Sequence, residues 1–156
     1  MDKKQKLLGE ILLHKGLLKP EQIEEALKIQ QKTKEFLGAI LIKKNYIKEK
    51  DLLGALSEQF SIPLVSLKNK YIHWNLVKQF SPSFILDYKC FPVKKDEWSI
   101  TMAITNPLDA WVLKKAEEAA GGGTKIQFVL VSHADMEEVI ERYKEHIRGD
   151  LFKMFK

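Results

Sequence analysis

The chain has 156 residues, of which 45% are hydrophobic and 30% charged, and its formal net charge is +5. This composition is typical of a globular protein with one sizeable core or two small cores that share an interface. It predicts neither a secretory signal, because Gly9 and Glu10 interrupt the first apolar run, nor a membrane-spanning segment, and the single cysteine, Cys90, excludes an internal disulfide and favours a reducing compartment.

The positive charge is concentrated in the first third of the chain. Residues 1–50 hold 12 lysines and seven acidic residues, whereas residues 51–156 hold 14 basic and 14 acidic residues. A local positive field favours encounters with anionic ligands, acidic protein surfaces or nucleic acid. The alternative is that these lysines only solvate the outer faces of helices.

An internal repeat occupies most of the first 59 residues. Residues 8–30 and 37–59 align with a shift of 29 residues, and nine of the 23 paired positions are identical. The identical residues of the first copy are Leu8, Gly9, Ile11, Leu12, Lys15, Lys19, Ala26, Leu27 and Gln30. Repeats of this length are typical of supersecondary units that need a neighbour to bury their apolar face.

Each copy of the repeat predicts a pair of helices. The apolar spacing indicates a helix over about 3–15 that ends at Gly16, and a second helix that begins at Pro20. The second copy predicts helices over 35–44 and 49–60. Asn45 replaces Gly16 between them, and asparagine is the next-best residue in a left-handed turn.

The remainder of the chain predicts a small α+β unit. Residues 62–67 indicate an extended seam, followed by short helical segments over 75–80 and 82–87. Strands are expected over 91–93, 98–104 and 125–131, and helices over 109–120 and from Ser132 to about His146. The strand over 98–104 is expected to alternate, with Trp98, Ile100, Met102 and Ile104 on one face.

We therefore predict an α+β protein in three parts. A helical subdomain of two tandem helix pairs covers residues 1–67, and an α+β subdomain with about three strands and flanking helices covers residues 68–146. Residues 147–156 form an amphipathic, basic tail. This tail is either the start of a linker or a short helix that docks on a partner, and Gly149 weakens the prediction of a continuous helix.

No catalytic motif is recognisable in the sequence. There is no phosphate-binding loop, and the glycines at 121–123 follow a predicted helix instead of preceding one. The four histidines are scattered, and one cysteine cannot complete a zinc site with them. We predict a protein that is not an enzyme and holds no metal.

The doubled pattern resembles a known family. Together with Pro63-Leu64-Val65-Ser66-Leu67 and Asn106-Pro107-Leu108-Asp109, it is similar to the N-terminal MshEN domain of type II secretion and type IV pilus assembly ATPases, over about residues 7–144. The resemblance implies a domain that precedes an ATPase module, which this sequence lacks. It also implies docking onto the cytoplasmic part of an inner-membrane platform protein, and hence a cytoplasmic protein recruited to that membrane without inserting into it.

For a subset of this family, the resemblance implies binding of cyclic di-GMP. The corresponding positions are Leu8, Gly9, Ile23, Leu27 and Gln30 in the first motif and Leu37, Gly38, Leu52, Leu56 and Gln59 in the second. Receptors carry an arginine and an aspartate where this chain has Leu7 and Asn106. Losing a charged hydrogen bond to a buried ligand costs on the order of 2–4 kcal/mol.

We expect a non-catalytic docking domain with a degenerate cyclic di-GMP site and no cofactor. A working cyclic di-GMP receptor that uses Lys6, Gln30 and Gln59 is the alternative. Nucleic-acid binding is a third and less favoured hypothesis, because the three tryptophans are not spaced as a ladder for stacking bases. The sequence leaves open which secretion or pilus system the domain serves and whether a longer chain contains it.

Overall fold

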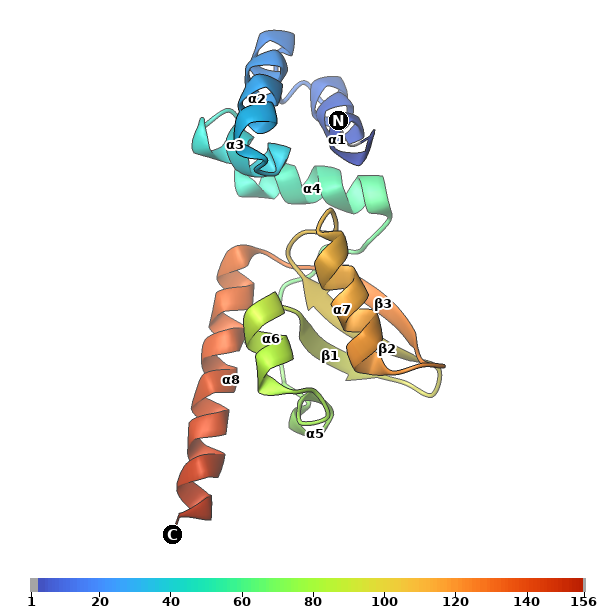
Figure 1. Cartoon of the computed structure of the whole chain (residues 1–156), viewed down its shortest axis with the longest axis vertical. Helices are drawn as coiled ribbons and strands as arrows, with labels where there is room; N and C mark the ends of the chain where they lie inside the picture. The colour runs from blue at the N-terminus through green and yellow to red at the C-terminus, as the bar shows by residue number, and fades with distance from the viewer. Residues whose placement is uncertain (1–2, 156) are drawn as a thin grey trace. The chain divides into compact units, whose positions relative to one another are not determined.

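The computed structural model describes residues 3–155, and the chain divides after Ile62 into two compact units (Figure 1). Helices α1 to α4 form the first unit, and the second unit contains a β-sheet with helices α5 to α8. The predicted α+β fold class is confirmed. The division comes before the expected boundary at residue 67, because residues 63–65 pair with the second unit. Leu130 N donates to Pro63 O at 2.8 Å, and Val65 N donates to Leu130 O at 2.9 Å.

The first unit consists of the two predicted helix pairs. The helices are α1 (Lys3–His14), α2 (Pro20–Thr33), α3 (Leu37–Lys43) and α4 (Glu49–Phe60). Only α3 differs noticeably from its expected range, since it begins two residues later than predicted. The fully buried leucines of the repeat, Leu8, Leu12, Leu37 and Leu41, lie in its core.

The local signals that begin and end these helices occur in both copies. Gln22 and Asp51, at equivalent positions, each accept a hydrogen bond from the backbone N–H just before their helix, at 2.9 and 3.1 Å. Gly16 and Asn45 both adopt left-handed backbone angles, with φ of 73° and 60°. The predicted exchange of glycine for asparagine in this turn is therefore confirmed.

A mixed sheet forms the centre of the second unit. Within the described residues it has three strands in the order β1 (Phe91–Lys95), β2 (Ser99–Ile104) and β3 (Lys125–Leu130). β1 and β2 are antiparallel, whereas β2 and β3 are parallel and are joined by the crossover helix α7 (Ala110–Ala120). A parallel pair requires such a crossover, and the helix predicted over 109–120 supplies it.

The second strand agrees only in part with its prediction, because Ile100, Met102 and Ile104 are alternate residues that share a face of β2, but burial is not confined to that face. All six residues of β2 are buried, because this central strand is covered on both faces. Trp98 lies outside the strand and is 77% exposed. Asp96 Oδ1 accepts hydrogen bonds from Trp98 N and Ser99 N at 2.8 and 2.7 Å, and the resulting turn ends before the strand begins.

The remaining helices of the second unit are α5 (Trp74–Val77), α6 (Pro82–Tyr88) and α8 (His133–Met154). Their buried side chains join those of the sheet in one core, whose fully buried members include Ile85, Met102, Ile104, Met136 and Ile140. All of this core lies between Leu67 and Tyr143 in sequence. The second unit therefore has a hydrophobic core of its own.

Asp135 ties the start of α8 to the segment that follows Ile62. Ser132 Oγ accepts from Asp135 N at 3.1 Å, which confirms the predicted cap. The carboxylate of Asp135 accepts from Ser66 Oγ and Leu67 N, both at 2.8 Å. Burial raises the pKa of this carboxyl, but the hydrogen bonds outweigh burial and hold the pKa below its ordinary value.

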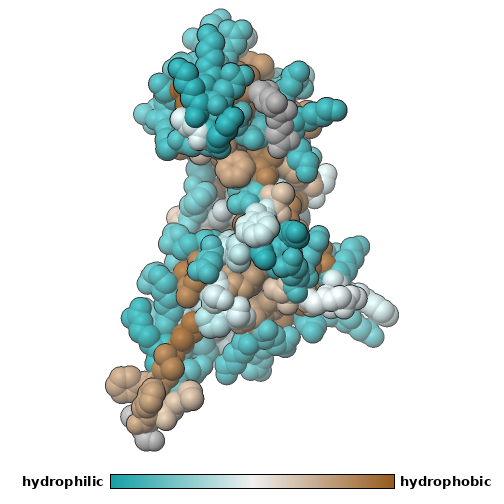
Figure 2. All heavy atoms as spheres, viewed as in Figure 1, coloured by the Kyte–Doolittle hydropathy of each residue, from teal (hydrophilic) through white to brown (hydrophobic). Residues whose placement is uncertain are grey.

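Helix α8 continues two turns beyond its predicted end near His146. Its first turns bury Met136, Val139, Ile140 and Tyr143. Large apolar side chains at the far end are exposed, and Figure 2 shows them gathered there: Leu151, Phe152, Met154 and Phe155. Lys156, the last residue of the predicted tail, lies outside the described residues. Among residues 3–155, no helix has both the length and the apolar character that crossing a bilayer requires.

Candidate functional site

The residues at the family's ligand positions are mostly buried inside the first unit. Leu8 and Leu37 are completely buried and Leu56 is 2% exposed. Gly9, Gly38, Ile23 and Gln30 are also buried, whereas Leu27, Leu52 and Gln59 are half-buried. Most of these side chains therefore pack within the unit in this structure and do not form an open apolar surface.

The two motif glycines contact a side chain from the second helix of their own pair. A Cβ atom added to Gly9 would lie 3.6 Å from Ile23 Cδ1, which is ordinary van der Waals contact. A Cβ atom added to Gly38 would lie only 2.6 Å from Leu52 Cδ1. Close helix packing therefore explains the glycine at position 38, while position 9 has room for a methyl group.

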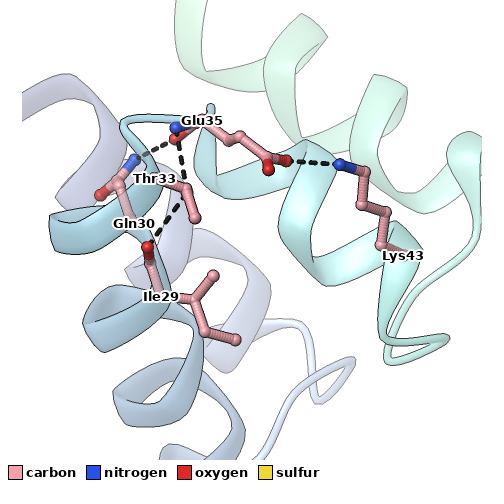
Figure 3. Close-up of polar contacts among 5 residues, drawn as sticks. All are labelled: Ile29, Gln30, Thr33, Glu35 and Lys43. Carbon is pink, nitrogen blue, oxygen red and sulfur yellow. Dashed lines mark hydrogen bonds and ion pairs between the residues drawn. The ribbon is translucent and has the colours of Figure 1, made fainter.

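The side-chain nitrogen of Gln30 is engaged in contacts within the chain. Its Nε2 donates to Glu35 O at 3.1 Å (Figure 3). The same nitrogen also donates to Gln5 Oε1. Figure 3 also shows Glu35 paired with Lys43 at 2.7 Å. This arrangement fixes the connection between α2 and α3, so Gln30 has a structural task that the motif alone did not indicate.

Gln5 is a residue of this site that the sequence did not single out. Its Oε1 accepts from Leu37 N at 2.9 Å, which satisfies a backbone donor at the start of α3. The two residues are 32 positions apart, and Gln5 lies before the repeated segment. No spacing or motif in the sequence therefore connects them.

Gln59, the equivalent of Gln30, is only partly satisfied. Its Nε2 donates to Lys4 O at 2.8 Å. Its Oε1 is buried and has no hydrogen-bond partner among the described residues. A buried acceptor without a partner is unfavourable by about 1–3 kcal/mol, so this oxygen could accept a hydrogen bond from a ligand or water.

The two positions that depart from the receptor pattern have other surroundings. Leu7 is 45% exposed at the start of the first motif. Asn106 Oδ1 accepts from Leu108 N at 3.0 Å and so holds the turn before α7. Asp109 Oδ1 accepts from Val112 N at 3.3 Å and caps that helix. Residues 106–109 therefore form the turn and the cap that begin α7.

Part of the positive charge of the repeat is balanced within the first unit. Lys15 pairs with Glu58 at 2.9 Å, and Lys44 pairs with Glu25 at 3.1 Å. Tyr46 also donates to Glu25 at 2.5 Å, and this hydrogen bond, followed by the contact with Lys44, holds the pKa of Glu25 below its ordinary value. These pairs attach the residues just after α1 and α3 to α4 and α2, which reduces the number of lysines available to an anionic partner.

Within residues 3–155, no three histidine, cysteine or acidic side chains converge as a metal site. The thiol of Cys90 is buried, and burial raises its pKa to about 12, which leaves it protonated and unreactive at neutral pH.

Comparison with known families decides the relationship. The model of the MshEN domain matches residues 60–150, which is more than half of the chain. The chain belongs to the MshEN domain family. This confirms the family predicted from the sequence, although the matched segment is nearly all in the second unit and leaves out most of the repeat that suggested it.

Curated relatives of this MshEN domain are longer proteins. It is 27% identical over 136 residues to the type IV pilus assembly ATPase PilB of Myxococcus xanthus. The aligned segment covers 87% of this chain and 24% of that protein. It is 28% identical over 118 residues to PilB of Thermus thermophilus, covering 74% of this chain and 13% of that protein. The chain thus spans a quarter or less of the curated relatives it matches.

Solved structures share the fold of this MshEN domain. The structure of MshE with cdg superposes with a TM-score of 0.80 at 22% identity, covering 87% of this chain and 97% of that one. The N-terminal domain of XpsE gives a TM-score of 0.68 at 18% identity, covering 91% and 96%. The shared fold therefore extends through both units.

Proposed function

We propose that this MshEN domain is a docking domain that connects a type II secretion or type IV pilus motor ATPase with a partner at the inner membrane. The observation that carries the proposal is the MshEN match together with the similarity to PilB and to the N-terminal domain of XpsE. The packed interior of the first unit supports it, because Gly38 and Gln30 serve internal contacts in place of a ligand.

The partner is the cytoplasmic domain of an inner-membrane platform protein. The basic repeat and the exposed apolar end of α8 are the surfaces that such a partner would contact. Binding would recruit the domain, with an ATPase module in the same or a separate chain, from the cytoplasm to the inner face of that membrane. The domain supplies attachment and orientation and takes no part in ATP hydrolysis.

A pull-down with the purified cytoplasmic domain of the matching platform protein tests this proposal. The wild-type chain should form a complex that survives gel filtration. A Phe152→Ser, Phe155→Ser variant should weaken the complex, whereas Trp98→Ser, which changes a comparably exposed aromatic residue elsewhere, should not. If the wild-type chain binds no platform domain from a secretion or pilus system, the docking function is wrong.

Cyclic di-GMP binding is the second candidate function. It is supported by the similarity to the structure of MshE with cdg and by the unpaired Gln59 Oε1 in the second motif. Two observations oppose it. Leu7 and Asn106 occupy positions where the receptors carry charged residues. Gln30 already donates a hydrogen bond to Glu35 O, in the connection that leads to α3. Losing one such charged contact weakens binding by about 30-fold to 1,000-fold.

Isothermal titration of cyclic di-GMP separates the two candidates. We expect no measurable heat from the wild-type chain at micromolar concentrations, and binding to appear when Leu7→Arg and Asn106→Asp are combined. Micromolar binding by the wild-type chain that disappears in Gln59→Ala would instead favour the receptor. Leu151→Arg is a suitable control, because it adds the same charge at an exposed site on α8.

A further inference from the structure

A hollow on the second unit has no role in the function proposed above. It has a volume of about 260 Å³ and lies between strand β1 and the segment around α5. We call it the Tyr71 hollow, and its lining includes Tyr71, His73, Trp74, Lys94 and Lys95. Aromatic rings on one wall and ammonium groups on the other give it a defined chemical character.

The aromatic wall of the Tyr71 hollow is held in place by ring contacts. Trp74 stacks on His146 of α8 with ring centres 3.9 Å apart and an angle of 3° between the planes. Tyr71 meets His73 edge to face at 4.9 Å, yet 78% of Tyr71 remains exposed. A large, orientated ring that the described chain leaves uncovered is typical of a contact residue in a protein interface.

The other wall of the hollow carries the ammonium groups of Lys94 and Lys95. Neither Lys94 nor Lys95 has an ion-pair partner among the described residues. Asp96 and Glu97 follow the two lysines in sequence, and Asp96, which accepts hydrogen bonds from two backbone N–H groups, also interacts electrostatically with Lys94 and offsets part of its charge. The sequence from 60 to 86, which supplies the aromatic wall, contains no acidic residue at all. The hollow therefore favours a negatively charged occupant.

An apolar recess adjoins the Tyr71 hollow. It has a volume of about 40 Å³, shares Tyr71 with the hollow, and is lined mainly by apolar side chains that include Ile72, Phe91 and Val93. Its size suits one small apolar group and not a nucleotide base. An occupant that fits both the Tyr71 hollow and the recess therefore carries negative charges next to an apolar side chain.

Strand addition at the edge of β1 does not explain these features. The strand contains Pro92, which has no N–H to donate, and its pairing with β2 is irregular between Pro92 and Lys94. Proline, bulges and lysines at a sheet edge discourage pairing with another strand. Recognition at this surface must therefore proceed through side chains.

We propose that the Tyr71 hollow binds an acidic protein segment, with carboxylates at Lys94 and Lys95 and an apolar side chain in the recess beside Tyr71. This inference rests on the proposed docking function, for which it specifies the chemistry of one contact. It places that contact on the second unit and not on the basic repeat. Attraction between exposed charges should make the contact sensitive to salt.

Nuclear magnetic resonance titration of the full 156-residue chain tests the inference. The probe is a short synthetic peptide with glutamates on both sides of one valine. Its addition should shift the amide signals of residues 71–76 and 94–95. The Lys94→Glu, Lys95→Glu variant should bind it weaker by about tenfold or more, because two favourable charge contacts become unfavourable. Tyr71→Ser should also weaken binding.

Lys125→Glu is the matched control, since Lys125 is an exposed lysine on the opposite edge strand of the same sheet. It should change peptide affinity by less than about twofold. Folding of every variant is verified by its unchanged spectrum away from the substitution. A peptide with glutamine in place of glutamate should bind weakly or not at all.

Three outcomes would overturn the inference. They are the absence of any shift with the glutamate peptide, an equal loss of affinity in Lys125→Glu, and tighter binding of single-stranded DNA to the same residues. The platform pull-down separates this result from the docking function. If the peptide fails while the platform complex forms, only the inference is wrong, whereas peptide binding without a platform complex contradicts the docking function alone.

Discussion

Gly9 and Gly38 occupy equivalent positions of the repeat but have different surroundings. Ile23 approaches Gly9 at an ordinary distance, whereas Leu52 lies against Gly38. The sequence presents the two glycines as identical, and packing distinguishes them. Their substitution by alanine should therefore change stability in opposite directions.

Gly38→Ala should destabilise the chain by about 1 kcal/mol, because overpacking against Leu52 outweighs the gain in helix propensity. Gly9→Ala should instead stabilise it by about 0.5–1 kcal/mol, since an interior helical glycine is replaced without a clash. Urea unfolding measures both changes. In a Leu52→Ala background, Gly38→Ala should no longer destabilise, and a persistent loss there would show that Leu52 is not the cause.

The Asp135 carboxylate should make stability depend on pH. Its pKa is lower in the folded chain than in the unfolded chain, so its contribution is fully present above about pH 4 and is lost as pH falls through the folded value. Asp135→Asn should lower the free energy of unfolding by roughly 1–2 kcal/mol at pH 7 and by less at pH 3. Glu138→Gln controls for the loss of one charge on the same helix, and a difference that does not shrink with pH would contradict this role.

At the scale of single elements, α8 differs most from its sequence prediction. The sequence indicated an end near His146, partly because glycine at position 149 disfavours a helix. In the structure the helix instead runs on to Met154, and His146 Nε2 lies 3.4 Å from Asp150 Oδ2, one turn further along. An α-helix tolerates one glycine when the turns on both sides are favourable.

Gly149→Ala should stabilise the exposed end of α8. A Cβ atom there would meet nothing within 4 Å, so the gain is the helix propensity of about 1 kcal/mol. Amide hydrogen exchange at Leu151 and Phe152 should slow by about fivefold, with global stability little changed. Gly121→Ala, where φ is 80°, should do the opposite and destabilise the end of α7. Unchanged exchange in Gly149→Ala would show that the last turns of α8 are not helical in solution.

At the scale of the whole molecule, the two units have separate cores. The buried core of the second unit consists of residues from Leu67 to Tyr143. Its sheet, its crossover helix and α8 include no residue of the repeat. The caps at Ser132 and Asp135 also bond within this unit. We therefore expect the second unit to fold without the first.

A fragment of residues 63–156 should therefore unfold cooperatively and retain the sheet signals of the full chain. Ile140→Ala in this fragment should lower the free energy of unfolding by about 2–4 kcal/mol, as expected for a well-packed core. Thermal unfolding followed by circular dichroism measures both. A fragment with no cooperative transition, or one indifferent to Ile140→Ala, would show that the second unit needs the first to order its core.

Much of this MshEN domain could be predicted from its sequence. The repeat, the turns at Gly16 and Asn45, the cap at Ser132, the strand ranges and the family depend on signals carried by neighbouring residues or on a repeated pattern. The ligand positions taken from the resemblance remain a prediction. Local propensity determines such features because helix and turn preferences arise within a few residues.

Only the tertiary structure determined the surroundings of particular side chains. Gln5 meets Leu37 across 32 residues, and Asp135 meets Leu67 across 68. The crowding at Gly38, the unpaired Gln59 Oε1 and the convergence of Tyr71 with Lys94 likewise depend on which helices and strands pack together. Packing brings together residues that no local pattern relates, and it therefore distinguishes two copies of a repeat that the sequence presents as the same.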